Sequence, residues 1–302
     1  MTTKKICVID GGGAKGVTPF TVIKNIEKTL GKNFSDIFDL AVGSSIGGII
    51  PGVLTMTDWS AEDLLPEFKK TLYNIFKPRM RLPIVQAKYS REKVERYLNK
   101  YLKGKTLGDA RTKYMLSSVN MVTGRTHFFK SWEEKDGGLS AVDVINRTYA
   151  APLYFGSVVD GKNKAVWLDG GTSNNSAPLV ESYVEVLKQG WTGDTKVHIL
   201  SLGCGQRSHE IPFKKAKKYN NLKQVLYYMN PLGGGAARVV AADSQTEWLK
   251  SLDEVTENFT FQRIELNNME PKIDVMDGRK YLDEYESIGE KLSRDVDYKY
   301  LE

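Results

Sequence analysis

Two short apolar runs, each ended by a glycine-rich turn and followed by a helical pattern, constrain this fold more than any other feature. The first, KICVID at 5–10, precedes three glycines and then apolar residues at helical spacing from Gly16 to Leu30. The second, from Phe38 to Val42, leads through GSSIGG into another apolar helical stretch. Strands that alternate with helices form mainly parallel sheets that helices cover on both faces. The sequence therefore predicts an α/β fold with a mainly parallel central sheet.

The rest of the chain continues this alternation. Further strand-like runs lie at 114–120, 126–129, 165–169 and 196–202. A basic helical insertion is predicted from about 64 to 107, and the region from about 214 to 302 is predicted to be helical, with a break at NPLGGGAA. Because 302 residues with 41% hydrophobic content can bury a sizeable core, we expect residues 1–302 to form a single domain.

Several features predict a cytoplasmic protein. No run approaches the roughly 18 to 20 consecutive apolar residues of a membrane-spanning helix, since the longest candidate, at 39–54, is interrupted by glycine, serine and proline. The stretch before the first glycines is too short for a signal-peptide core. Cys7 and Cys204 both lie in apolar runs and are predicted to be small core residues instead of a disulfide.

The net charge of +6 is distributed unevenly along the chain. Between Lys77 and Lys113 there are twelve lysines or arginines and three acidic residues. Such a block can be the solvated face of a helix, a contact surface for nucleic acid, or a surface for anionic lipid head groups. Charge alone leaves these three interpretations open.

The pentapeptide GSSIG places Ser45 between Gly43 and Gly47, after an apolar strand and before a helix. This is the context that the GxSxG pattern requires, because small neighbours let the backbone turn sharply and present the serine hydroxyl at the strand end. The helix that follows directs its N-terminus toward developing negative charge. Ordinary turns also contain glycine and serine, so the pentapeptide by itself does not establish a nucleophile.

Gly11, Gly12, Gly13 and Gly16 in DGGGAKG allow two interpretations. The spacing fits the dinucleotide pattern GxGxxG, but a ribose-binding acid should then follow the second strand, whereas Asp39 precedes it. A phosphate-binding P-loop is excluded because no Lys-Ser or Lys-Thr follows a GxxxxG spacing here. Consecutive glycines also expose backbone amides that can hold a tetrahedral oxyanion, and this second interpretation remains.

Asp169, in WLDGGTSNN, follows a short apolar strand and precedes Gly170 and Gly171. Its carboxylate is therefore predicted to lie at a strand end, as Ser45 is. A surface turn would have a similar sequence, so the assignment gains its weight from the combination of motifs.

Five motifs in this order and spacing resemble those of patatin-like phospholipases. They are DGGGAKG at 10–16, GSSIGG at 43–48, RTYAAPLYF at 147–155, DGGTSNN at 169–175 and ILSLGCG at 199–205. The resemblance covers roughly Lys5 to Gly205. Two departures are visible: Lys15 stands where an arginine is common, which keeps the charge but loses the planar fork, and the segment after Asp169 is longer than usual before its proline.

This resemblance implies a three-layer α/β/α fold and a Ser–Asp dyad in place of a catalytic triad. By position it implies that Ser45 is the nucleophile and Asp169 the base. It also implies that the amides of Gly12, Gly13 and Ala14 form the oxyanion hole. A carboxylate can activate a serine where a poorly solvated pocket raises its basicity. The chemistry requires no cofactor and no metal.

The three histidines offer an alternative. His127 and His198 lie in strand-like runs and are predicted to be core or sheet residues. His209 follows the run at 196–202 and completes the chain order Ser, Asp, His of α/β-hydrolases. A triad that includes His209 is therefore the alternative to the dyad.

The leading functional hypothesis is hydrolysis of acyl esters of membrane glycerophospholipids by an enzyme that associates peripherally with an anionic membrane surface. The alternatives are a soluble carboxylesterase and a catalytically silent lipid-binding protein. No nucleic-acid polymer is expected as a partner, and the sequence does not indicate an oligomeric state. The resemblance also implies a possible small-molecule activator such as a cyclic nucleotide, which the helical C-terminal region could bind, although no residue identifies a ligand.

The basic insertion separates these alternatives. Its apolar residues, interleaved with Lys77, Arg79 and Arg81, have the composition of a segment that lies at a lipid interface. These apolar residues are Phe76, Met80, Leu82, Pro83, Ile84 and Val85. The other interpretation is a lid helix that packs on the core.

Overall fold

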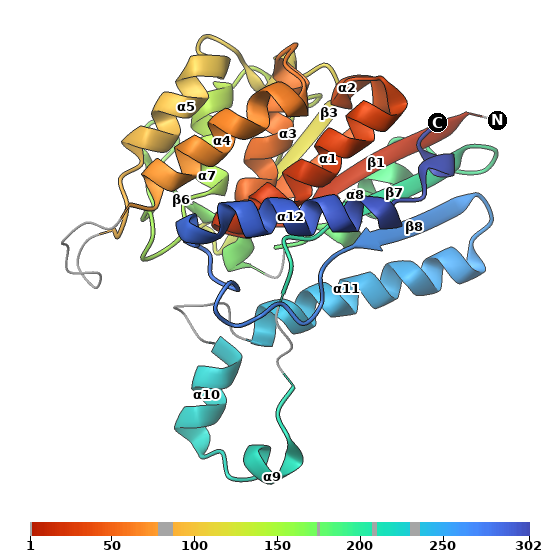
Figure 1. Ribbon diagram of the computed structural model, residues 1–302. Coiled ribbons are helices and arrows are strands. Elements are labelled where there is room, and N and C mark those ends of the chain that lie inside the picture. Colours follow the sequence, from red (N-terminus) through yellow and green to blue (C-terminus); the bar gives the residue numbers. More distant parts are fainter. Residues whose placement is uncertain (1, 78–86, 174–175, 207–209, 230–235) are drawn as a thin grey trace.

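The computed structural model describes residues 2–77, 87–173, 176–206, 210–229 and 236–302, and a sheet lies at its centre (Figure 1). Within this part of the chain the sheet has eight strands: β1 (Thr3–Ile9), β2 (Leu40–Ser44), β3 (Lys113–Asn120), β4 (Arg125–Lys130), β5 (Val158–Asp160), β6 (Ala165–Asp169), β7 (Lys196–Leu202) and β8 (Phe259–Ile264).

The strand order is β5-β6-β3-β2-β1-β7-β8. Strands β2 and β6 lie one after the other along the same side of β3, and β4 pairs with the opposite side. Strands β3, β2, β1, β7 and β8 are parallel, whereas β4 and β6 run antiparallel to β3. The prediction of a mainly parallel sheet is therefore confirmed. Since parallel strands end at the same edge, residues that follow β1, β2 and β7 come together there.

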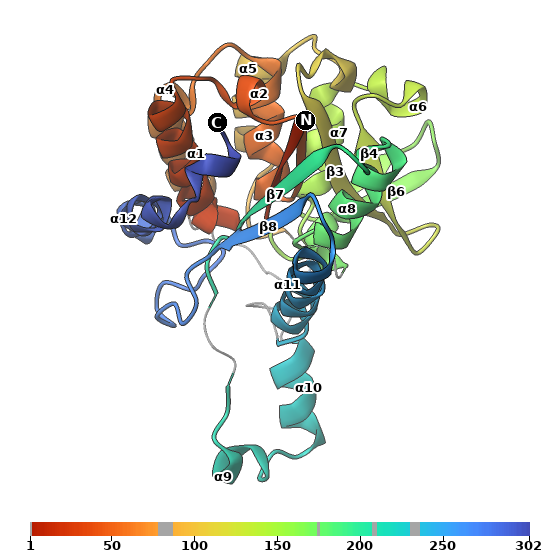
Figure 2. The same cartoon turned by 90° about the vertical axis from the view of Figure 1, so that its right-hand side faces the viewer.

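Helices cover both faces of the sheet, which gives three layers (Figures 1 and 2). One face is covered by α1 (Val17–Leu30), α2 (Phe34–Ile37), α3 (Ile46–Met56), α4 (Ala61–Ile75), α5 (Glu92–Leu102), α7 (Ala141–Thr148) and α12 (Leu282–Leu292). The other face is covered by α8 (Leu179–Lys188) and α11 (Ala236–Val255). The shorter helices are α6 (Glu134–Gly137), α9 (Phe213–Ala216) and α10 (Asn221–Met229).

Alternation along β1 divides the core between the two faces. Cys7 and Ile9 join the cluster under α1 and α3, whereas Ile6 and Val8 join the cluster under α8 and α11. All four are fully buried, as expected for a central strand whose successive side chains point to opposite faces. The three-layer arrangement follows from strands that are apolar on both sides.

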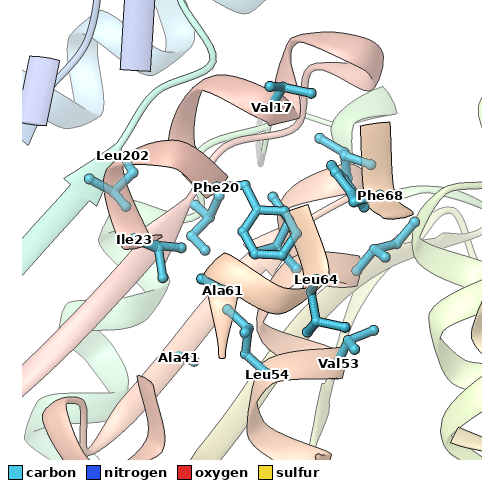
Figure 3. Close-up of a cluster of buried hydrophobic side chains, with 14 of the residues drawn as sticks. Val17, Phe20, Ile23, Ala41, Val53, Leu54, Ala61, Leu64, Phe68 and Leu202 are labelled. Atoms are coloured by element: carbon cyan, nitrogen blue, oxygen red, sulfur yellow. The ribbon is translucent and has the colours of Figure 1, made fainter. Parts of the chain in front are cut away.

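Figure 3 shows part of the larger cluster, in which Phe20 of α1 and Phe68 of α4 meet edge to face with ring centroids 4.9 Å apart. Helix α4 begins at a capping box in which the Ser60 hydroxyl accepts from the Asp63 amide. Its apolar face is buried along its length, at Leu64, Phe68 and Leu72. The helical insertion is thus part of the core layer.

Two sequence-based expectations differ from the structure. The region beyond residue 214 was expected to be helical, yet β8 lies within it and extends the sheet beside β7. The described residues of the insertion form two helices, of which α4 begins at Ala61 and α5 ends at Leu102, so these bounds lie slightly earlier than predicted.

The described part of the chain contains no helix whose length and apolar character would allow it to cross a bilayer. Cys7 and Cys204 are both buried free thiols, as predicted, and burial raises the pKa of each.

Candidate active site

Sheet register brings Ser45 and Asp169 together. Ser44, the last residue of β2, pairs with Ser117 of β3, and Asp169, the last residue of β6, pairs with the next residue, Ser118. Strand β6 thus takes the place beside β3 where β2 ends. The Ser45 hydroxyl donates a 2.6 Å hydrogen bond to Oδ2 of Asp169, although 124 residues separate the two in the chain.

The backbone around Ser45 explains the two glycines of its motif. Ser45 has a φ of 56°, which few residues other than glycine adopt. A Cβ on Gly43 would lie 1.9 Å from the Gly47 carbonyl oxygen, and a Cβ on Gly47 would lie 2.2 Å from the Ile9 carbonyl oxygen. Any side chain at either position would therefore open the sharp turn between β2 and α3.

Thr148 holds the backbone of Ser45 in place. Its Oγ1 accepts a 2.9 Å hydrogen bond from the Ser45 amide and donates to the Ser117 carbonyl at 2.7 Å. Thr148 is fully buried at the end of α7. Thr148 belongs to the RTYAAPLYF motif, but nothing in that motif alone connects this threonine with the turn at Ser45.

Asp169 is 2% exposed and Ser45 is 6% exposed, so the pair lies away from bulk solvent. Oδ1 of Asp169 accepts a 2.7 Å hydrogen bond from the Gly171 amide, which leaves Oδ2 directed at Ser45. Gly170 cannot carry a side chain, because its Cβ would lie 2.2 Å from Oγ of Ser117. The DGG sequence thus orients the carboxylate through its own turn.

The glycine-rich loop lies beside Ser45. A Cβ on Gly11 would lie 3.2 Å from the Ser45 Cβ, and one on Gly16 would lie 2.5 Å from Ile46. Gly13 has a φ of 60°, in the left-handed region that glycine adopts without strain. The glycine-rich loop therefore packs closely against the turn that carries Ser45.

The amides of this loop are not equivalent. The Ala14 amide donates a 2.7 Å hydrogen bond to the Met276 carbonyl, so of the three amides that the resemblance assigns to the oxyanion hole it is the one already bonded within the chain. The amides of Gly12 and Gly13 donate no hydrogen bond to any residue that the structure describes. Sequence reasoning could not foresee the Met276 contact because it comes from a distant loop.

Residues from the C-terminal part of the chain bind side chains of the glycine-rich loop and hold it in place. Arg263 of β8 binds both carboxylate oxygens of Asp10, at 2.8 and 2.6 Å, and also binds Glu265. Burial alone would lower the pKa of Arg263, but the two carboxylates outweigh it and raise that pKa. Lys15 bonds to Asp274 at 2.6 Å and to the Gly205 carbonyl at 2.8 Å. These contacts with the loop join residues 190 to 259 positions apart in the chain, so no local motif predicts them.

A narrow apolar pocket opens beside Ser45. Its wall is formed by α3, α4 and α5, by two aromatic residues that follow α7, and by Gly13 of the glycine-rich loop, and nearly all of its surface is apolar. The lining residues are Gly13, Ser45, Ile46, Ile49, Phe68, Thr71, Leu72, Ile75, Phe76, Val94, Tyr97, Tyr149 and Phe155. An aliphatic chain fits such a lining because it gains by leaving water and offers no polar group to satisfy.

Phe76, which we expected at a lipid interface, is instead 4% exposed and packs against Tyr89 and Phe155. Lys77 is exposed, and the remaining members of that predicted segment lie outside the described residues. These are Arg79, Met80, Arg81, Leu82, Pro83, Ile84 and Val85. The described helices on either side of this gap pack on the core.

The two described histidines have partners other than Ser45 and Asp169. His198 is buried in β7, where its Nδ1 lies 2.8 Å from Oγ1 of Thr260, and His127 is partly buried in β4 near Asp136, as the prediction of sheet positions required. His209 lies outside the described residues. Asp39 binds Lys4 and the Lys5 amide at the opposite edge of the sheet, which agrees with the argument against a dinucleotide site.

Comparison with known proteins places this geometry in context. Residues 7–180 match the family described as patatin-like phospholipase. The chain is 30% identical to a cGAMP-activated phospholipase of Pseudomonas aeruginosa, over 67% of this chain and 62% of that protein, and 28% identical to one of Escherichia coli, over 66% and 61%. It is 22% identical to patatin-like protein 1 of Arabidopsis thaliana, over 95% and 80%. The chain thus spans about three fifths of the length of the two bacterial relatives.

Proposed function

Because the chain belongs to the patatin-like phospholipase family, we propose that it is a serine lipid acyl hydrolase in which Ser45 is the nucleophile and Asp169 the base. The observation that carries the proposal is the 2.6 Å hydrogen bond from the Ser45 hydroxyl to Asp169 at the mouth of an apolar pocket. A hydroxyl becomes an effective nucleophile when a base within hydrogen-bond reach removes its proton.

In the proposed mechanism, Asp169 takes the hydroxyl proton as Oγ of Ser45 attacks the ester carbonyl carbon. The carbonyl oxygen becomes an oxyanion, which the Gly12 and Gly13 amides stabilise. Removal of one such donor typically costs on the order of 10²-fold in rate or more. The tetrahedral intermediate collapses, and the leaving alkoxide takes the proton from Asp169. Water, activated by the same carboxylate, then cleaves the acyl-enzyme and releases the fatty acid and Ser45.

We propose membrane glycerophospholipids as the substrate and peripheral association with an anionic membrane surface as the setting. The apolar pocket beside Ser45 supports a long acyl chain, since each buried methylene contributes about 0.8 kcal/mol. The names of the bacterial relatives support a further proposal, that a cyclic nucleotide activates hydrolysis. Addition of cGAMP to the assay below is expected to raise the rate.

The test is release of fatty acid from anionic and zwitterionic vesicles, with a short-chain soluble ester measured in parallel. We expect Ser45→Ala and Asp169→Asn each to lower both rates by at least about 10³-fold while circular dichroism stays unchanged. The double variant should be no slower than either single variant, because the two side chains act as one proton-transfer unit.

Three results would contradict this proposal. Turnover of the soluble ester alone would indicate a carboxylesterase, and vesicle binding without any turnover would indicate a silent lipid-binding protein. A double variant much slower than both single variants would mean that Ser45 and Asp169 act independently.

A further inference from the structure

Helices α9 and α10 stand away from the layered body in both views (Figures 1 and 2). From Glu210 to Tyr227 every described residue is exposed or half-buried, and none is buried. We call residues 213–227 the lysine-rich projection. Because these residues pack little against the rest of the chain, packing does not account for their composition.

The projection carries positive charge without compensation. Its five lysines, all exposed, are Lys214, Lys215, Lys217, Lys218 and Lys223. No acidic residue occurs between Glu210 and Asp243. None of the five lysines forms an ion pair with a residue in the described part of the chain.

The same projection exposes large apolar side chains. Phe213 is 78% exposed and Leu222 is 66% exposed. Leu222, Val225 and Leu226 follow the i, i+3, i+4 spacing that places them on one face of α10. Lysines beside an exposed apolar face are typical of helices that lie at the surface of a bilayer, where the apolar side chains enter the head-group region and the lysines meet anionic lipid.

The position of the projection fits this partner. It follows β7, whose carboxyl end lies beside the glycine-rich loop, since a Cβ on Gly12 would lie 2.5 Å from the Cys204 Cβ. The projection therefore rises from the edge of the sheet where Ser45 lies. A second copy of the chain is a poor partner, because it would set five lysines against five lysines.

We propose that the lysine-rich projection docks the protein on anionic bilayers. Docking would turn the carboxyl ends of the parallel strands, where Ser45 lies, toward the lipid substrate. This inference rests on the proposed lipid hydrolysis, which it deepens by naming the surface that contacts the membrane. It replaces the basic insertion, whose described helices bury their apolar faces, as the docking element.

The charge test uses the full chain carrying Ser45→Ala, so that vesicles stay intact, and measures co-sedimentation with vesicles of phosphatidylglycerol and phosphatidylcholine. Each lysine near an anionic surface is worth about fivefold in binding, so Lys214→Gln, Lys215→Gln, Lys217→Gln and Lys218→Gln together should weaken it by several hundredfold, on the order of 10²–10³. Added salt should weaken binding of the parent in the same direction.

A matched control removes the same charge from the opposite edge of the sheet. Lys28, Lys32, Lys103 and Lys105 lie in the segments that lead into the amino ends of β2 and β3. Their joint replacement by glutamine should leave vesicle binding nearly unchanged, because these charges would lie farther from the bilayer than the Debye length of roughly 8 Å. With Ser45 restored, neither quadruple variant should change turnover of a short soluble ester.

Insertion of the apolar side chains into the bilayer is tested separately, with an environment-sensitive dye attached to Phe213→Cys. The two native thiols are buried with raised pKa values, so the introduced thiol is the one that reacts. Anionic vesicles should shift its emission to the blue, whereas the same dye at Lys28→Cys should not respond.

The proposal fails if the projection variant binds as the parent does, or if Lys77→Gln, Arg79→Gln and Arg81→Gln together weaken binding more. It also fails if sedimentation without lipid shows that the parent is a dimer and that, of the variants, only the projection variant is a monomer. A second copy of the chain would then be the partner of the projection. Binding through the projection without fatty-acid release would overturn the proposed hydrolysis and leave the docking intact, so the two failures are distinguishable.

Discussion

Helices α4–α5 and α9–α10 both carry lysines together with apolar residues, yet their apolar side chains have opposite surroundings. In α4 and α5 the apolar face is buried, and Phe68, Leu72 and Tyr97 line the pocket beside Ser45. Their charges are also engaged: Lys69 pairs with Asp283 and Glu286 of α12, and Lys100 pairs with Glu67. In α9 and α10 the apolar side chains of Phe213, Leu222, Val225 and Leu226 are exposed, and the lysines lack ion pairs within the described residues.

Charge and apolar periodicity therefore predict that a segment forms an amphipathic helix, but they do not predict what its apolar face contacts. The same pattern stabilises a helix against a protein core or against a membrane, because both remove apolar surface from water. What decides is whether another element of the chain reaches the apolar face. For α4 that element is α1, through the contact of Phe20 with Phe68.

The largest contrast is expected in stability. Phe68→Ala should lower the free energy of unfolding by about 3–5 kcal/mol, because it leaves a cavity between α1 and α4. Leu222→Ala, on the exposed face of α10, should change it by no more than about 0.5 kcal/mol. Urea denaturation of both variants measures the difference, and equal losses would mean that α10 packs on a surface as α4 does.

A smaller effect is expected on substrate choice. Thr71→Trp places a large side chain in the pocket from α4, and displacing three methylenes at about 0.8 kcal/mol each should lower kcat/KM for a long-chain ester about 50-fold. An acetyl ester should react as before, and vesicle binding should not change. Lys70→Trp, at an exposed neighbouring position of α4, is the matched control. A uniform loss across chain lengths would show that the pocket does not hold the acyl chain.

The smallest effect is expected in the segment that joins β7 to α9. His209→Ala should leave turnover within a few-fold of the parent, because Asp169 already accepts the Ser45 hydrogen bond directly. Steady-state kinetics on the soluble ester provides the measurement. A loss of roughly 10³-fold or more would restore the triad interpretation, since that is the scale of a removed triad member.

The sequence was sufficient for features that are encoded locally. Ser45 lies in a turn that needs Gly43 and Gly47, and Asp169 lies in a turn in which Gly171 orients its carboxylate, so short motifs located both residues. The sequence also predicted the fold class, because strand–turn–helix units recur along it. The meeting of the two side chains follows from the register of β2 and β6 along β3, which no single motif encodes.

Features that depend on distant segments escaped prediction. The Ala14 amide meets the Met276 carbonyl, and β8 joins the sheet after a long helix. Burial of Phe76 depends on Tyr89 and Phe155, which lie across the insertion and in another motif. Each of these contacts depends on where the chain returns in space, whereas periodicity reports only on neighbours within a few turns.

The support of the glycine-rich loop also sets an order of events during synthesis. Asp274, the partner of Lys15, is synthesised 259 residues after it. Arg263, the partner of Asp10, is synthesised 253 residues after it. A growing chain therefore carries its serine turn and its aspartate turn long before the glycine-rich loop at 10–16 gains its anchors. Under the proposed function, hydrolytic competence is therefore expected to appear late in translation, only after β8 has been synthesised.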